Sequence, residues 1–312
     1  MDVPAAVFPL LIRALGAGRP YASPDAARAK MQKLAVRPRQ YAPPRRLGAP
    51  VTITAERRDG WLQYRITPAS GPTSGSVVYA HGGGWVYAIQ APHWRLAARM
   101  AVECRTTVVV PIYPLVPFGT ALEAVDGFTR SALEAEQRYG PVRLAGDSAG
   151  GQIALATALQ LRDAHSLVVP MTVLDAPALD LSLTNPDIPS VPDPWLSAAG
   201  IKVFADAWRG DLPVDDPRVS PLAGDLHGLG PICLLTGTHD ILNPDARLLA
   251  RRAREAGVEF TLHEEAGALH TYSFMPTAAG RRGRRAILDA LTLPPRASRA
   301  AAPARTSSGR ST

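Results

Sequence analysis

The chain has 312 residues, of which 46% are hydrophobic and 20% charged, as in an ordinary soluble globular protein. This length allows one large α/β domain or two smaller domains. The net charge is +7, but the basic residues form no single helical stripe, so we interpret them as surface charge and expect no nucleic acid partner. The two cysteines, Cys104 and Cys233, have apolar neighbours and favour buried free thiols over disulfides or a zinc site.

Residues 1–45 predict short apolar helices separated by prolines, including one over 24–34 that begins at Pro24. The first residues are acidic and proline-bearing, unlike the basic start and unbroken apolar run of a secretory signal. We therefore expect a cytoplasmic protein, with weak membrane attachment through this region left open. The apolar residues that allow such attachment are Phe8, Leu10, Leu11 and Ile12.

Residues 46–293 predict strands and helices in alternation. Two strands at 51–54 and 61–66 surround an Asp59-Gly60 turn signal and predict a hairpin. An antiparallel hairpin followed by strand–helix units predicts an α/β fold, with a mostly parallel sheet between two layers of helices. Further strands are expected at 77–80, 107–110, 142–145, 172–174, 232–235 and 259–262, and helices at 92–103, 120–138, 152–159, 244–256 and 278–291.

Two segments do not follow this alternation. Residues 177–224 are rich in proline and aspartate and contain one helix-like piece at 197–208. We expect this insertion to fold over the strand ends, where it forms a helical cap together with residues 1–45. The basic tail at 294–312 is predicted to be disordered.

The stretch Gly146-Asp147-Ser148-Ala149-Gly150 lies between a predicted strand and a predicted helix. It matches the G-x-S-x-G nucleophile elbow, in which a sharp turn exposes the serine at the positive end of a helix. Gly146 and Gly150 fit this turn because a Cβ at either position would clash with the neighbouring element. With 26 glycines in the chain the motif could arise by chance, so it needs support from other residues.

That support comes from His81-Gly82-Gly83-Gly84-Trp85, which directly follows the strand at 77–80. Acyl transfer places negative charge on a carbonyl oxygen, and preorganised N–H donors stabilise that charge. We expect the donors to be the backbone amides of Gly82 and Gly83, together with Ala149. A phosphate-binding loop is the alternative, but the P-loop lysine and the G-x-G-x-x-G pattern are both missing.

The two glycine motifs together resemble the hormone-sensitive lipase family of α/β-hydrolases, in its bacterial esterase branch, over about residues 50–291. The resemblance implies an α/β-hydrolase fold with a helical cap and no cofactor. It also implies a serine carboxylester hydrolase that cleaves short- to medium-chain esters through an acyl-enzyme. One stretch departs from the family: residues 113–118 lack the arginine and glutamate of the phrase Tyr-Arg-Leu-Ala-Pro-Glu.

The acid and the base of a triad follow the serine in the order acid, then histidine. Asp240 comes after the strand at 232–235, and the family phrase Gly-x-x-Asp-x-Leu implies the same acid. The alternative for Asp240 is a helix cap, for which Asp245 is better placed. His270, between the last strand and the last helix, is the expected base. Among the other histidines, His81 is expected to support the oxyanion loop and His93 to lie on the surface.

The remaining predictions concern the surroundings of Ser148. Asp147 is expected to make a structural hydrogen bond that holds the elbow or the oxyanion loop. No metal-ligand cluster is expected, because no H-x-x-x-H or H-E-x-x-H motif and no paired cysteines occur. Two rival functions stay open, an amide-directed hydrolase such as an arylformamidase and a non-catalytic ligand receptor, and so does a homodimer. The aromatic candidates for the acyl pocket are Trp85, Tyr87 and Trp195, with Trp208 and Phe118 beside them.

Overall fold

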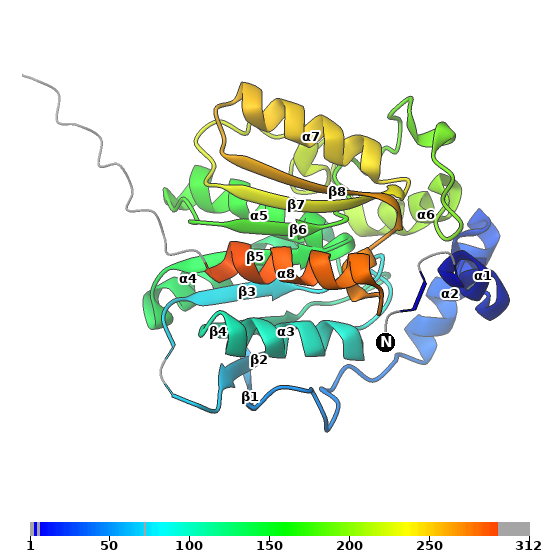
Figure 1. The fold of residues 1–312 in the computed structure, drawn as a ribbon. Coiled ribbons are helices and arrows are strands. Elements are labelled where there is room, and N and C mark those ends of the chain that lie inside the picture. The colour runs from blue at the N-terminus through cyan, green and yellow to red at the C-terminus, as the bar shows by residue number, and fades with distance from the viewer. Residues whose placement is uncertain (1–2, 5–6, 72, 293–312) are drawn as a thin grey trace, which may run out of the picture.

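The computed structural model describes residues 3–4, 7–71 and 73–292, and within these ranges eight strands form one sheet. The strand order is β1-β2-β4-β3-β5-β6-β7-β8 (Figure 1). β2 pairs antiparallel with both β1 and β4, and every other pair is parallel. The strands are β1 Val51–Arg58, β2 Trp61–Pro68, β3 Ser76–Ala80, β4 Thr107–Ile112, β5 Val142–Asp147, β6 Thr172–Asp175, β7 Ile232–His239 and β8 Phe260–Leu269.

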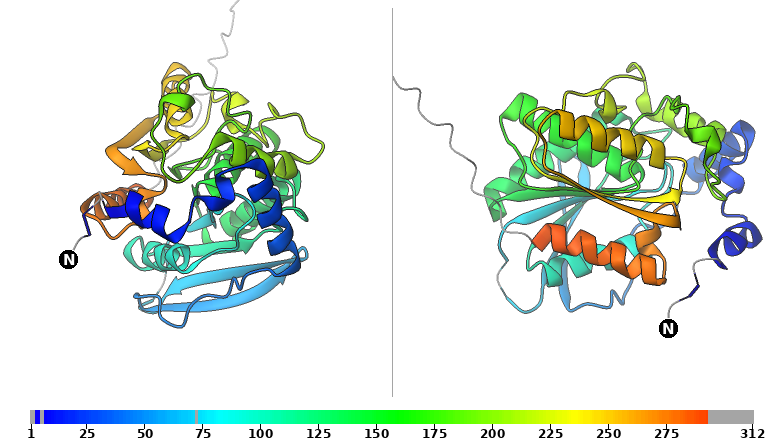
Figure 2. Two further views of the ribbon diagram at one scale, coloured as in Figure 1. Left: turned by 90° about the vertical axis from the view of Figure 1, so that its right-hand side faces the viewer. Right: turned by 45° about the horizontal axis from the view of Figure 1, so that its top comes forward.

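Helices lie on both faces of this sheet, as Figures 1 and 2 show. α3 and α8 cover one face, and α4, α5 and α7 cover the other. The expected α/β fold, with its mostly parallel sheet between two layers of helices, is confirmed. The helices are α1 Val7–Leu15, α2 Pro24–Val36, α3 Ala91–Glu103, α4 Ala121–Tyr139, α5 Ala149–His165, α6 Ala198–Arg209, α7 Asn243–Glu255 and α8 Ala278–Thr292.

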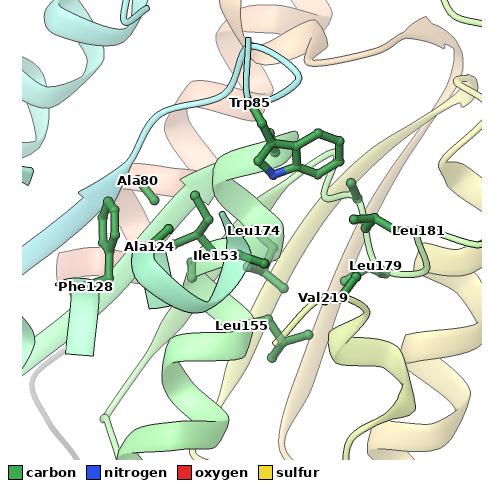
Figure 3. Packing of buried hydrophobic residues seen from close by; sticks show 14 of the residues in the cluster. Ala80, Trp85, Ala124, Phe128, Ile153, Leu155, Leu174, Leu179, Leu181 and Val219 are labelled. Atoms are coloured by element: carbon green, nitrogen blue, oxygen red, sulfur yellow. The ribbon is translucent and has the colours of Figure 1, made fainter. Parts of the chain in front are cut away.

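The period of two along each strand divides the apolar residues into two cores. In β3, Val77 packs in the core under α3 and α8, whereas Val78 packs in the core under α4 and α5. Central strands are buried on both faces, and β3 and β5 accordingly have no exposed residue. Figure 3 shows the second core from close by, with Phe128 of α4 and Ile153 of α5 packed below the indole of Trp85.

The N-terminal helices and the inserted segment meet at one end of the sheet (Figure 2). α2 packs against α6, and the hydroxyl of Ser197 donates a hydrogen bond to the carbonyl of Tyr21. A Cβ on Gly200 would lie 2.2 Å from that carbonyl oxygen, so the approach of the two segments depends on this glycine. The expected boundaries of a cap at 1–45 and 177–224 stay a prediction, and the tail at 294–312 lies outside the described residues.

Of the helices in the described ranges, none combines the length and apolar character that crossing a bilayer requires. Cys233 is buried and Cys104 half-buried, and both are free thiols as expected.

Candidate active site

Ser148 lies at the turn between β5 and α5 in a left-handed backbone conformation, with φ at 53°. Two glycines make this turn sterically allowed. A Cβ on Gly146 would lie 2.2 Å from the carbonyl oxygen of Gly150, and a Cβ on Gly150 would lie 2.0 Å from that of Ala80. The Ser148 amide donates to the carbonyl of Asp175 at 2.8 Å, which fixes the turn against β6. The predicted elbow is therefore present.

Ser148, His270 and Asp240 form a continuous hydrogen-bonded chain. The distance between Ser148 Oγ and His270 Nε2 is 2.8 Å, and that between His270 Nδ1 and Asp240 Oδ2 is also 2.8 Å. An ionised carboxylate can only accept, so Nδ1 carries the proton and Nε2 is left to accept from the serine hydroxyl. Asp240 follows β7 and His270 follows β8, so neighbouring strand ends place the two side chains. The structure brings together all three residues predicted from the sequence.

The Asp240 carboxylate is held from more than one side, and it changes the pKa of His270. Asp240 is fully buried, and its Oδ1 accepts the Leu242 amide at 3.0 Å. Burial alone would lower the pKa of His270. Attraction to Asp240 and the hydrogen bond between them, with the charges of Asp193 and Asp175, outweigh burial and raise that pKa above its usual value. The imidazole is therefore poised to take up a proton.

The oxyanion loop differs from the sequence prediction at one glycine. The Gly82 amide donates to Asp147 Oδ1 at 3.0 Å, so this donor is already engaged. Among the described residues, the amides of Gly83, Gly84 and Ala149 have no acceptor, and all three residues line the cavity beside Ser148. The expected role of Gly82 as an oxyanion donor is not met, because its N–H holds the loop instead.

Asp147 has the loop-holding role that the sequence predicts. Its Oδ1 also accepts the Tyr79 hydroxyl at 2.5 Å, and its Oδ2 lies 3.3 Å from His93 Nε2. Burial would raise the pKa of Asp147, but attraction to His93 and the hydrogen bonds from His93 and Tyr79 outweigh burial and lower it. His93 is buried, so its predicted place on the surface is wrong; its Nδ1 accepts the Gln90 amide at the start of α3.

His81 supports the same loop, as expected. Its ring stacks on Tyr113 with centroids 4.6 Å apart, and the Tyr113 hydroxyl donates to the His81 carbonyl at 2.9 Å. Burial lowers the pKa of His81 to about 4, so this ring is neutral near pH 7. Within the divergent stretch 113–118, the Val116 amide also donates to the Trp85 carbonyl at 2.9 Å. None of the residues 113–118 is among the described residues that line the cavity beside Ser148. This stretch therefore supports the oxyanion loop from the side that faces away from the cavity.

The cavity beside Ser148 has a volume of about 490 Å³, within the range of small-molecule sites. The three aromatic residues predicted for the pocket, Trp85, Tyr87 and Trp195, all line it. Trp195 comes from the inserted segment and lies edge-on to the His270 ring, 5.8 Å between centroids. Phe118 and Trp208 do not line it: Phe118 is 74% exposed, and Trp208 is fully buried.

Sequence reasoning missed or misplaced several polar residues near the site. Asp193 accepts the Ile241 amide at 3.0 Å through Oδ2, and it thereby fixes the inserted segment to the loop that carries Asp240. The one signal near Asp193 in the sequence is Trp195, two residues further on, which is predicted to line the acyl pocket. The sequence predicts Asp245 as the cap of α7, and this prediction is wrong. Its carboxylate instead accepts a hydrogen bond from Asn185 Nδ2 at 2.8 Å. Lys30 and Arg39, which also line the cavity, carry no signal in the sequence.

Within residues 3–4, 7–71 and 73–292, no group of three or more His, Cys, Asp or Glu side chains could hold a metal ion.

Comparisons with known proteins place this geometry among esterases and lipases. The family described as alpha/beta hydrolase fold matches residues 77–274. A triacylglycerol lipase of Mycobacterium tuberculosis is 34% identical over 67% of this chain, which spans 44% of that lipase. An acetyl-hydrolase of Streptomyces hygroscopicus is 30% identical over 68% of this chain and 72% of its own length. The crystal structure of an esterase from the bacterial hormone-sensitive lipase family has the same fold, with a TM-score of 0.75 at 24% identity over 91% of this chain and 97% of that one.

Proposed function

Because this chain belongs to the α/β-hydrolase fold family, we propose that it is a serine carboxylester hydrolase that cleaves short- to medium-chain acyl esters. The observation that carries this proposal is the pair of 2.8 Å contacts that joins Ser148, His270 and Asp240. The relatives named triacylglycerol lipase and acetyl-hydrolase support an ester substrate. The cavity of about 490 Å³ supports an acyl chain of modest length.

In the first half of the reaction, Ser148 Oγ attacks the ester carbonyl while His270 Nε2 takes up the hydroxyl proton. Asp240 keeps the imidazole in the required tautomer and stabilises the imidazolium. The amides of Gly83, Gly84 and Ala149 donate to the oxyanion, and each such donor typically contributes about 3 kcal/mol to the transition state. His270 then gives its proton to the leaving alcohol, and the acyl group stays on Ser148.

In the second half, water attacks the acyl-enzyme. His270 takes a proton from the water, the ester bond to Ser148 breaks, and the proton returns to Oγ as the carboxylic acid leaves. No step consumes a cofactor, because the proton that His270 accepts is returned in each half-reaction.

The test uses p-nitrophenyl butyrate with the wild type and Ser148→Ala. We expect the rate to fall at least about 1000-fold in the variant, because the nucleophile is lost. Equal rates would exclude Ser148 from the mechanism. A fluorophosphonate probe should label Ser148 in the wild type and fail to label His270→Ala, since the serine then has no base.

The two rival functions are less well supported. The relatives' names do not favour an arylformamidase, and comparing ester with formamide turnover separates that activity from esterase activity. A non-catalytic receptor has no use for a base in contact with the serine, whereas His270 lies 2.8 Å from Ser148 Oγ.

Residues 1–45 and 177–224 are proposed to form the cap over the pocket, since Pro20 and Trp195 both line it. The exposure of Leu10, Leu11 and Leu15 supports weak membrane attachment through α1. Ile12 is also expected to take part, but its side chain is buried and cannot contact a membrane. A homodimer and a cytoplasmic location stay predictions of the sequence.

A further inference from the structure

One side of the active-site cavity carries two cations that the proposed reaction does not use. Lys30 of α2 and Arg39, three residues beyond the end of that helix, line the same cavity as Ser148. Both lie over the ring of Tyr87: Lys30 Nζ is 5.1 Å and Arg39 Cζ is 5.8 Å from its centroid. Tyr87 belongs to the segment that follows the oxyanion glycines, and its amide donates to the Gly83 carbonyl at 3.0 Å. The two cations are thus tied to the reacting end of the cavity.

No carboxylate compensates this pair. Across the described part of the chain, neither Lys30 nor Arg39 forms an ion pair with an Asp or Glu side chain. Asp147, which also lines the cavity, is buried and already bonded to the Gly82 amide and the Tyr79 hydroxyl.

The two cations also repel one another. Partial burial, followed by repulsion from Arg39 and from Lys33, lowers the pKa of Lys30. An anion bound by both Lys30 and Arg39 would relieve this repulsion, and a guanidinium and an ammonium together bind a carboxylate or phosphate oxygen strongly.

The lining of the cavity is mainly apolar, and Leu196, Ile201 and Phe274 are among its apolar members. Such a lining suits a hydrocarbon linker and does not bind a second polar group. The cavity of about 490 Å³ has room for a linker of several carbons in addition to the ester. Two cations in an otherwise mainly apolar lining therefore favour an amphiphilic substrate.

Resting on the proposed esterase function, we propose that the preferred substrates are esters that carry a second, anionic group, bound by Lys30 and Arg39 while the ester carbonyl lies against Ser148. The anionic group sits on either the acyl or the alcohol part of the ester. In both cases Lys30 and Arg39 determine specificity and take no part in the proton transfers.

The test compares two matched pairs of substrates. Mono-p-nitrophenyl adipate and p-nitrophenyl hexanoate have acyl chains of equal length and differ by one carboxylate on the acyl side. 4-Acetoxybenzoate and phenyl acetate differ by one carboxylate on the alcohol side. We expect kcat/KM of the wild type to be about fivefold higher for the anionic member of one pair, mainly through a lower KM. The pair that shows the preference identifies the side that carries the anion.

The variant Lys30→Met/Arg39→Gln should lower this ratio of anionic to neutral kcat/KM about tenfold, to one or below, and 0.5 M NaCl should weaken the wild-type preference. The control is Arg28→Met, which removes an exposed cation of the same helix that lies outside the described lining of the cavity and does not act on Lys30, and it should retain the wild-type ratio. An unchanged thermal unfolding midpoint shows that the double variant is folded.

Two failures are distinguishable. If the wild type hydrolyses the neutral esters but shows no preference in either pair, or if the double variant keeps the preference, the assignment of Lys30 and Arg39 is overturned and the esterase function stands. If the wild type hydrolyses none of the four esters, the proposed function itself is overturned.

Discussion

At the scale of single residues, one carboxylate connects the nucleophile turn to the oxyanion loop. Asp147 directly precedes Ser148, and its Oδ1 holds the Gly82 amide at 3.0 Å. A Cβ on Gly82 would lie 2.1 Å from Asp147 Oδ2 and 2.7 Å from the Asp147 carbonyl oxygen, so this close approach requires a glycine. Asp147 therefore acts on the reaction by positioning the amides of Gly83 and Gly84.

We expect Asp147→Ala to lower kcat about 100-fold with little change in KM, because the oxyanion donors lose their alignment while the acyl pocket keeps its walls. Asp147→Asn should recover part of this loss, since its amide oxygen can still accept from Gly82 and Tyr79. Steady-state kinetics on p-nitrophenyl butyrate measure both effects. A loss confined to KM, or equal losses in the two variants, would contradict the positioning role.

The second prediction at this scale concerns pH. His270 must be neutral to accept the serine proton, so kcat/KM falls as the pH decreases through its pKa. Asp240 raises that pKa above the usual value, so the acidic limb lies above about pH 6.5. Asp240→Asn removes the attraction and should move the limb to lower pH, with kcat reduced about 1000-fold or more. A pH–rate profile checks the direction, and a limb that stays in place would exclude Asp240 as the partner of His270.

At the scale of elements, most strands and helices can be predicted from hydrophobic periodicity and from the residues that favour turns. The alternation of strands and helices can be predicted because β3 is apolar after Ser76, because β5 is apolar except for Arg143 and the final Asp147, and because the elbow glycines mark a strand-to-helix turn. The sequence does not show whether the amide of Gly82 or that of Gly84 donates to the oxyanion. This depends on which amide the Asp147 carboxylate takes, and that contact joins residues 65 positions apart.

The contact between α6 and the N-terminal segment leads to the third prediction. Gly200 is buried, and a Cβ there would lie 2.2 Å from the Tyr21 carbonyl oxygen, a backbone atom that cannot easily move away. Gly200→Ala should separate the two segments, lower the free energy of unfolding by about 1–3 kcal/mol and raise KM, because Tyr21 and Ile201 both line the cavity.

The matched control is Ala199→Val, an enlargement at the exposed neighbouring position of the same helix. Chemical denaturation and KM for p-nitrophenyl butyrate give the two readouts. If Gly200→Ala is as stable and as active as the control, the close approach of α6 to Tyr21 does not hold the pocket in shape.

At the scale of the whole molecule, the fold, the triad and the aromatic lining could be predicted, because each leaves a local pattern in the sequence. His93, Lys30 and Arg39 could not, since each acquires its role only from residues that the fold brings near. His93 reaches the Asp147 carboxylate at 3.3 Å across two elements. In the sequence, Lys30 has the pattern of an exposed helix position. Only the fold brings it next to the ring of Tyr87. Titratable side chains whose partners are distant in the sequence are thus the part of the molecule that sequence patterns describe least well.

The buried carboxyl group of Asp175 links the site to global stability. Burial raises the pKa of Asp175 to about 7, against the lowering effect of its hydrogen bond from Ser273. Since the folded state prefers the protonated acid, the stability that this group contributes is complete below about pH 4 and is lost as the pH rises towards 7. His270 acts in the same direction, because its raised pKa adds stability at low pH that is lost as the pH rises through that pKa.

The fourth prediction follows from Asp175. Asp175→Asn stays uncharged at every pH, and its amide oxygen can still accept from Ser273. We therefore expect the variant to gain free energy of unfolding relative to the wild type at pH 8, by up to about 4 kcal/mol, and to gain much less at pH 4.5. Urea denaturation at the two pH values measures the difference. Asp187→Asn, at an exposed position, should change stability little at either pH. An equal gain at pH 4.5 and pH 8 would mean that the pKa of Asp175 is not raised in the folded state.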